Sequence, residues 1–121
     1  MSYIDGFVMA VPNANKQKFI EHANNSDTIF TDMGATRVTE CWGDDVPEGS
    51  TTDFRKAVQA KEDETVVLSW VEWPDKATRD AAMAKMMSED FSDERMDSEK
   101  NPMPFDGKRM IFGGFETIIE L

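Results

Sequence analysis

The segment from Thr65 to Trp73 constrains the fold of this chain more than any other. It reads Thr-Val-Val-Leu-Ser-Trp-Val-Glu-Trp and is rich in the β-branched and aromatic side chains that favour strands. Because the apolar run is almost continuous, we expect both faces of this strand to be buried. Pro74 ends the strand, since proline cannot donate a hydrogen bond to a neighbouring strand. The chain is therefore expected to fold around a sheet that is covered on both sides.

Three other segments predict strands. The residues from Tyr3 to Val11 place apolar side chains on both faces, and Ala35 to Asp44 alternates more weakly. The segment from Lys108 to Glu120 follows an Asp106-Gly107 turn and becomes almost wholly apolar. It lacks the charge or proline that commonly protects the edge of a sheet, so we expect this last strand to lie inside the sheet.

Two segments predict helices. Asn13 is a suitable cap for a helix that extends to Met33, and the polar run from Asn24 to Asp27 favours a break within it. Asp75 can cap a second helix that runs to about Met87, with Met87 on its buried side. The charged segment that follows, up to Asn101, has no clear period and predicts a loop or a short irregular helix.

A weakly alternating segment from Asp53 to Ala60 predicts one additional strand. The polar turn from Lys61 to Glu64 would join it to the next strand as a hairpin. The predicted order is then strand, helix, strand, extra strand, strand, helix, strand. This order indicates an α+β fold of the ferredoxin-like βαββαβ type with an added hairpin strand, formed by one domain over residues 1–121.

Large apolar residues on both sheet faces predict a homodimer. Two helices can cover only one face of such a sheet, which would leave side chains such as Phe7, Trp70 and Phe115 in water. An exposed apolar patch of that size is unusual for a monomer. The economical solution is a second copy whose sheet packs on the first with twofold symmetry.

The composition excludes several classes of partner. The formal net charge is −11, from 13 basic and 24 acidic residues, which opposes binding to nucleic acid and to anionic lipid. The chain has no apolar run long enough to span a bilayer and no apolar signal segment, so we expect a cytoplasmic protein. A single cysteine, Cys41, and a single histidine, His22, on a polar part of the first helix, predict neither a metal site nor a bound cofactor.

Two acidic residues are candidates for catalysis. Glu40 shares a strand face with Val38 and Trp42, and apolar surroundings tend to raise the pKa of a carboxyl group, as a general acid or base requires. The alternative is that Glu40 pairs with a nearby arginine, Arg55 or Arg109. Glu72 also shares a face with a tryptophan, and it either lines a cavity or reaches water at the strand end.

The stretch from Asp106 to Phe115 offers a further candidate contact. Lys108 and Arg109 follow a turn and could meet an anionic group of a ligand. The pair Gly113-Gly114 indicates a bulge, a close approach by a ligand, or only a conformational need of the strand.

Several motifs resemble those of the YbaA-like family of small bacterial proteins. They are Asp5-Gly6-Phe7-Val8, Asp53-Phe54-Arg55, Gly113-Gly114-Phe115-Glu116 and the longer runs Glu40 to Pro47 and Met103 to Ile111. The resemblance covers essentially the whole chain. It implies a dimeric α+β barrel, in which two ferredoxin-like sheets pack face to face, and it supplies no catalytic residues. The wider superfamily includes small cofactor-independent enzymes and ligand-binding regulators, and that comparison is a fold analogy only.

These observations lead to two hypotheses. The first is a protein that binds or converts a small organic molecule in a pocket between the sheet and its helices or its partner. The second is a non-catalytic structural or interaction protein whose charged residues only stabilise the dimer. Whether the chain is an enzyme stays open. The candidate residues are Glu40 and Glu72 for catalysis and Phe7, Trp42, Arg55, Trp70 and Arg109 for ligand binding.

Overall fold

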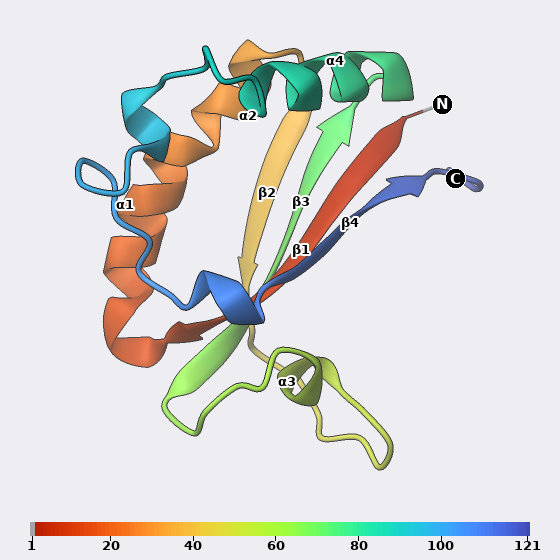
Figure 1. Cartoon of the computed structure of the whole chain (residues 1–121). Helices are drawn as coiled ribbons and strands as arrows, with labels where there is room; N and C mark the ends of the chain where they lie inside the picture. Colours follow the sequence, from red (N-terminus) through yellow and green to blue (C-terminus); the bar gives the residue numbers. More distant parts are fainter. Residues whose placement is uncertain (1) are drawn as a thin grey trace.

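The computed structural model describes residues 2–121 and has one four-stranded antiparallel sheet, in the order β2-β3-β1-β4. Helices α1, α2 and α4 cover one face of this sheet (Figure 1). The strands are β1 (Tyr3–Pro12), β2 (Arg37–Trp42), β3 (Glu64–Trp73) and β4 (Ile111–Glu116). The helices are α1 (Lys16–Ser26), α2 (Thr28–Asp32), α3 (Phe54–Ala57) and α4 (Lys76–Met86), with 3-10 turns at Asn13–Asn15, Glu94–Met96 and Gly107–Arg109.

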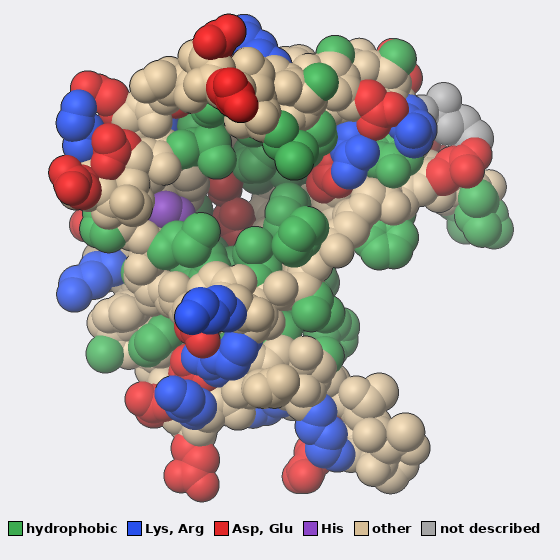
Figure 2. Space-filling model, viewed as in Figure 1, with side chains coloured by type: hydrophobic (Ala, Val, Ile, Leu, Met, Phe, Trp, Pro, Cys, Tyr) green, Lys and Arg blue, Asp and Glu red, His purple; other side chains and the backbone are tan. Residues whose placement is uncertain are grey.

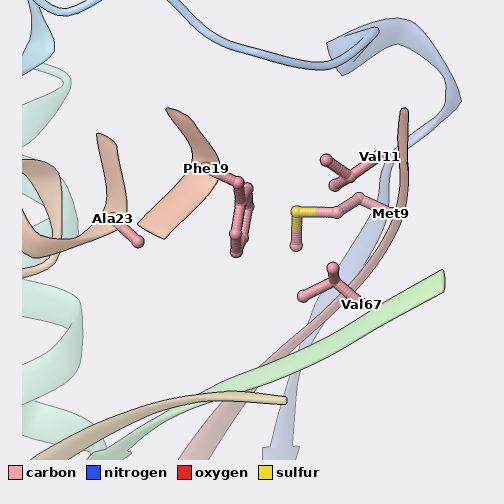
Figure 3. Packing of buried hydrophobic residues seen from close by; sticks show 5 residues of the cluster. All are labelled: Met9, Val11, Phe19, Ala23 and Val67. Carbon is pink, nitrogen blue, oxygen red and sulfur yellow. The ribbon is translucent and has the colours of Figure 1, made fainter. Parts of the chain in front are cut away.

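The expected burial of both faces of β3 is found in full only on the face toward the helices, because Leu68 on the other face is exposed. This strand pairs with β1 on one side and β2 on the other, and its fully buried residues include Val67, Val71 and Trp73. Figure 3 shows how Phe19 and Ala23 of α1 pack onto strand residues, among them Met9 and Val67. This packing sets the distance between α1 and the sheet.

An ion pair between β1 and α4 joins the helices to the sheet at the end remote from Phe19 and Ala23. The Asp5 carboxylate of β1 accepts hydrogen bonds from the Trp73 indole at 2.9 Å and from the Arg79 guanidinium of α4 at 2.8 Å. Gly114 of β4 pairs with Asp5, and a Cβ atom there would lie 2.9 Å from the Arg79 guanidinium. A larger residue at this position would therefore force the Arg79 and Tyr3 side chains to move.

The predicted cap at Asn13 is wrong, because Asn13 begins a 3-10 turn and α1 starts at Lys16 without a side-chain cap, whereas the predicted break and the second cap are found. The first predicted helix is interrupted at Asp27, which separates α1 from α2. Asp75 caps α4 by accepting a hydrogen bond from the Thr78 amide at 2.7 Å. The predicted burial of Met87 is wrong, because this residue follows the end of α4 and its side chain is 84% exposed.

The predicted hairpin strand from Asp53 to Ala60 is wrong. Asp53 instead caps the single turn α3 by accepting a hydrogen bond from the Lys56 amide. Gln59 then adopts a positive φ of 51°, which ends the turn. Val58, which follows α3, is buried against Ala10 and Val66 on the sheet face that the longer helices leave uncovered. The hydrogen bond by which Asp53 caps α3 thus favours a helical turn over the strand that the weak alternation of apolar residues predicted.

The predicted interior position of the last strand is also wrong. Strand β4 pairs only with β1 and forms an edge of the sheet. It begins at Ile111 because Asp106 caps the preceding 3-10 turn, which includes Lys108 and Arg109. Phe115 faces away from the helices and is 61% exposed. The apolar sequence of β4 was therefore not evidence that this strand lies in the interior of the sheet.

The sheet face opposite the long helices remains partly open. Strand pairing places Val8, Leu68 and Ile111 in one row on that face, and Leu68 and Ile111 are 41% and 46% exposed. The helices predicted from the sequence thus cover one face, as expected. Within residues 2–121, none of the helices has the length and hydropathy needed to cross a bilayer.

Candidate functional site

A cavity of about 370 Å³ lies between α1 and α2 on one side and the helix-facing side of the sheet on the other. Its walls are mostly apolar, and residues of the segment between α4 and β4 form part of the rim. Figure 2 shows this hollow with hydrophobic side chains around it, acidic side chains at its base and the single histidine at its margin. Its lining includes the aromatic residues Phe7, Phe19, Phe30 and Phe105 and the methionines Met9, Met86, Met96, Met103 and Met110.

Two acidic side chains, Glu40 and Asp27, line this cavity together. Glu40 faces the helices because alternate residues of β2 point to the same side, and its Cα pairs with that of Ser69 on β3. Asp27 lies at the junction of α1 and α2. The Oε2 atom of Glu40 is buried and receives no hydrogen bond from any N–H or O–H group within residues 2–121. Buried oxygens without a donor are rare and need an explanation.

The explanation is that Glu40 holds a proton. Burial is the main cause that raises the pKa of Glu40 to about 9. The neighbouring Asp27 raises this pKa further, through hydrogen bonding and through the repulsion of its negative charge, whereas the Ser69 hydroxyl lowers it. Burial also raises the pKa of Asp27, against the opposing effects of Glu40 and His22. Two carboxyl groups in one buried site cannot both ionise readily. The raised pKa values of both groups therefore favour one proton shared by the pair at neutral pH, and the larger effect falls on Glu40.

His22 lies at the margin of the same cavity, and its tautomer is defined by Asn101. The Asn101 amide nitrogen donates to the Arg95 carbonyl at 2.7 Å, so its oxygen faces the Nδ1 atom of His22 at 3.1 Å. Because that oxygen can only accept, the proton of a neutral His22 lies on Nδ1. The Nε2 atom then carries a lone pair.

Arg95 fastens the segment after α4 onto the helices. Its guanidinium donates to Asp93 at 2.6 Å, to Asp32 of α2 at 2.7 Å and to the Thr28 hydroxyl at 3.0 Å. Although Arg95 lines the cavity, its donors are directed to these partners. The rim is thereby held in place by charge-assisted hydrogen bonds.

The structure brings only two of the seven candidate residues, Glu40 and Phe7, to this cavity. Trp42 borders a neighbouring groove between α1 and β2, where the Lys16 ammonium lies 5.3 Å from the centre of its ring. Trp70 and Glu72 lie on the opposite face of the sheet. There the Trp70 indole donates to Glu72 at 3.3 Å, and Arg37 approaches Glu72 at 3.9 Å.

The two candidate arginines meet at Glu64, far from Glu40 in the sheet. Arg109 donates to both carboxylate oxygens of Glu64, at 2.7 and 2.8 Å, and Arg55 donates to its backbone carbonyl at 2.8 Å. The Arg109 guanidinium lowers the pKa of Glu64 to about 2. The alternative that Glu40 pairs with Arg55 or Arg109 is therefore wrong.

Sequence reasoning missed two residues of this cavity. Asp27 was interpreted only as part of a helix break, yet it lies four residues after Ala23 and three before Phe30, on the buried stripe of the first helix. An acid on an apolar stripe was the available signal. His22 was noted only on a polar part of the first helix, yet its ring is partly buried and packs edge-on against Phe105.

Comparison with known proteins confirms the predicted resemblance. The chain is 54% identical over 120 residues to "Uncharacterized protein YbaA" of Escherichia coli strain K12, with 99% of each chain covered. The proteins of the same name from Escherichia coli O157:H7 and from Shigella flexneri match to the same extent. A family model described as "Protein of unknown function (DUF1428)" matches residues 2–107. The chain therefore belongs to the DUF1428 family.

Proposed function

We propose that this protein binds, and acts on, a small and largely apolar organic molecule in the cavity beside Glu40. The observation that carries the proposal is the buried Oε2 atom of Glu40, which lacks a donor in an otherwise apolar cavity. The cavity volume of about 370 Å³ falls within the range of ligand sites. A few polar groups on an apolar wall are also typical of such sites.

In this proposal the acid pair contacts the one polar group of the ligand and exchanges a proton with it. Glu40 is the proton donor in its neutral form, and the neighbouring Asp27 disfavours its ionised form. Phe7 and its aromatic neighbours provide the apolar walls. A carboxyl group whose pKa lies above neutrality can serve as a general acid, and its ionised form as a general base. A protein that only binds the molecule, without converting it, would need the same contacts.

We further infer a ferredoxin-like core and a homodimer. The antiparallel order β2-β3-β1-β4 supports the ferredoxin-like core. Exposure of Phe115, Ile111 and Leu68 on the open sheet face supports a partner copy that packs sheet to sheet, as in a dimeric α+β barrel. Sedimentation of a monomer at micromolar concentration would contradict the dimer. The cytoplasmic location stays a prediction, which fractionation of expressing cells tests.

Methionine methyl NMR tests whether the cavity takes up a ligand. Met9, Met86, Met96, Met103 and Met110 line the cavity, whereas Met87 lies outside it and is exposed. With 13C-methyl methionine, we expect millimolar 2-phenylethanol to shift cavity methyl signals in a saturable manner and to leave Met87 unchanged. The cavity signals are assigned by single Met→Leu substitutions.

The role of Glu40 is tested with a matched pair of variants. Glu40→Gln keeps the size of the side chain and removes the acid, and Glu48→Gln makes the same change at an exposed loop position. We expect weaker binding of the alcohol in the Glu40 variant only. Equal shifts at Met87 and at the cavity methyls, or no saturable shift at all, would count against the proposed function.

A further inference from the structure

We propose that the ligand of this cavity is an organic cation, namely a small aromatic or aliphatic amine held as its ammonium form between Glu40 and Asp27. The inference rests on the proposed function and adds the chemical class of the ligand. It follows from three features of the cavity. Its walls are aromatic, its base is acidic, and the basic side chains near it already contact other groups.

The aromatic walls suit a cation. Phe19 and Phe105 lie with ring centres 5.9 Å apart, and Phe7 and Phe30 line the same cavity from β1 and α2. The faces of aromatic rings carry partial negative charge and attract ammonium groups, most strongly where water is excluded. An amine that carries an apolar body would thus meet favourable contacts at both of its ends.

The acidic base of the cavity supplies the specific contact. Glu40 from β2 and Asp27 from the α1–α2 junction both line the cavity, and Glu40 Oε2 lacks a donor. Two carboxyl groups that share one proton carry one negative charge, and an ammonium group would neutralise it. Its N–H groups would also give the buried oxygen the hydrogen bond that it lacks.

The positive and titratable groups around the pair do not favour an anion. Arg95, from the 3-10 turn after α4, is bound to Asp93 and Asp32. Lys16 borders the groove on the other side of the pair, with its ammonium over the Trp42 ring. His22 of α1 donates from Nδ1 to Asn101 when neutral. Neither Arg95 nor Lys16 is thus left to hold a carboxylate or phosphate, and a neutral His22 offers only the lone pair of Nε2.

Proton transfer on binding is balanced within the site. A neutral amine would accept the proton of Glu40, forming an N–H bond as the O–H bond breaks. The product is an ammonium ion between two carboxylates, with no electrons transferred and no further reactant needed. An amine that arrives already protonated neutralises the single negative charge of the pair, and Glu40 keeps its proton.

The test compares three probes of matched shape: 2-phenylethylamine, 2-phenylethanol and phenylacetate. Affinities are measured at pH 7.5 by isothermal titration calorimetry and by the cavity methionine signals. We expect the amine to bind about tenfold tighter than the alcohol, as a charge-assisted hydrogen bond allows, and phenylacetate to bind most weakly. Asp27→Asn and Glu40→Gln should each reduce the preference for the amine, whereas Glu48→Gln should leave it unchanged.

The outcomes separate this inference from the proposed function. If the alcohol binds as tightly as the amine, the cavity takes small molecules and the cation inference is wrong. If phenylacetate binds tightest, the charge argument is wrong as well. If none of the three binds in a saturable manner, the proposed function itself fails.

Discussion

Asp5 and Glu40 are two acids on the same helix-facing side of one sheet, and their surroundings differ completely. The Asp5 carboxylate receives hydrogen bonds from the Trp73 indole and from the Arg79 guanidinium. Glu40 has an acidic neighbour, Asp27, and one oxygen without a donor. Asp5 therefore stabilises the fold through its ion pair with Arg79, whereas burial and the neighbouring Asp27 disfavour the ionised form of Glu40. Burial alone does not make an acid functional, and the available partners decide its role.

The largest expected effect is the loss of the Asp5 ion pair. Asp5→Ala leaves the buried Trp73 indole without an acceptor and removes the ion pair of the partly buried Arg79 guanidinium, so the free energy of unfolding should fall by roughly 3 kcal/mol. Urea denaturation measures this change. Asp80→Ala is the matched control, because Asp80 also contacts Arg79 but is solvent-accessible, and it should change stability little. A similar loss in both variants would show that the buried position of Asp5 is not what matters.

Replacement of Glu40 should change the free energy of unfolding in the opposite direction, so that the variant is stabilised. A group whose pKa is raised in the folded state contributes stability below its unfolded pKa and loses that contribution as the pH rises through the folded value. For Glu40 this window runs from about 4.5 to about 9. Glu40→Gln should therefore match the natural protein near pH 4 and be more stable at pH 9, by roughly 1–3 kcal/mol. Urea denaturation at both pH values tests this, and a destabilised variant at pH 9 would overturn the comparison.

Loss of the Glu64–Arg109 pair should have the smallest effect on stability. The contribution of this pair falls as the pH is lowered, which is the reverse of the dependence expected for Glu40. Arg109 depresses the pKa of Glu64 to about 2, so this group contributes stability above its ordinary pKa of 4.5 and loses it as the pH falls through about 2. Arg109→Met should flatten the decline of thermal stability between pH 5 and pH 2. Melting curves by circular dichroism measure it. An unchanged acid slope would mean that other carboxylates dominate acid unfolding.

The sequence predicted the parts of this fold that depend on local pattern. The apolar run of Thr65 to Trp73, the cap at Asp75 and the break near Asp27 all appear in the structure, because each depends on residues adjacent in the chain. The segment from Asp53 to Ala60 was mispredicted because one side-chain cap redirects a weak pattern into a helical turn. The edge position of β4 could not be predicted, since it depends on which strands pair.

The candidate site was only partly predictable for the same reason. A raised pKa of Glu40 was predicted from its apolar strand neighbours, and in the folded protein burial and Asp27 act in that direction. Its partner Asp27 comes from a different element, and only tertiary packing brings the two together. The arginines Arg55 and Arg109 have suitable chemistry for an anion, but they fold against Glu64 instead.

The central claim is that Glu40 holds a proton at neutral pH, and its titration by NMR tests this most directly. The side-chain carboxyl carbon of Glu40 is followed from pH 4 to pH 10 in protein labelled with 13C, and Glu40→Gln assigns the signal. A protonated Glu40 should give a midpoint near 9, accompanied by a smaller response from Asp27. A midpoint near 4.5, the ordinary value for glutamate, would contradict it.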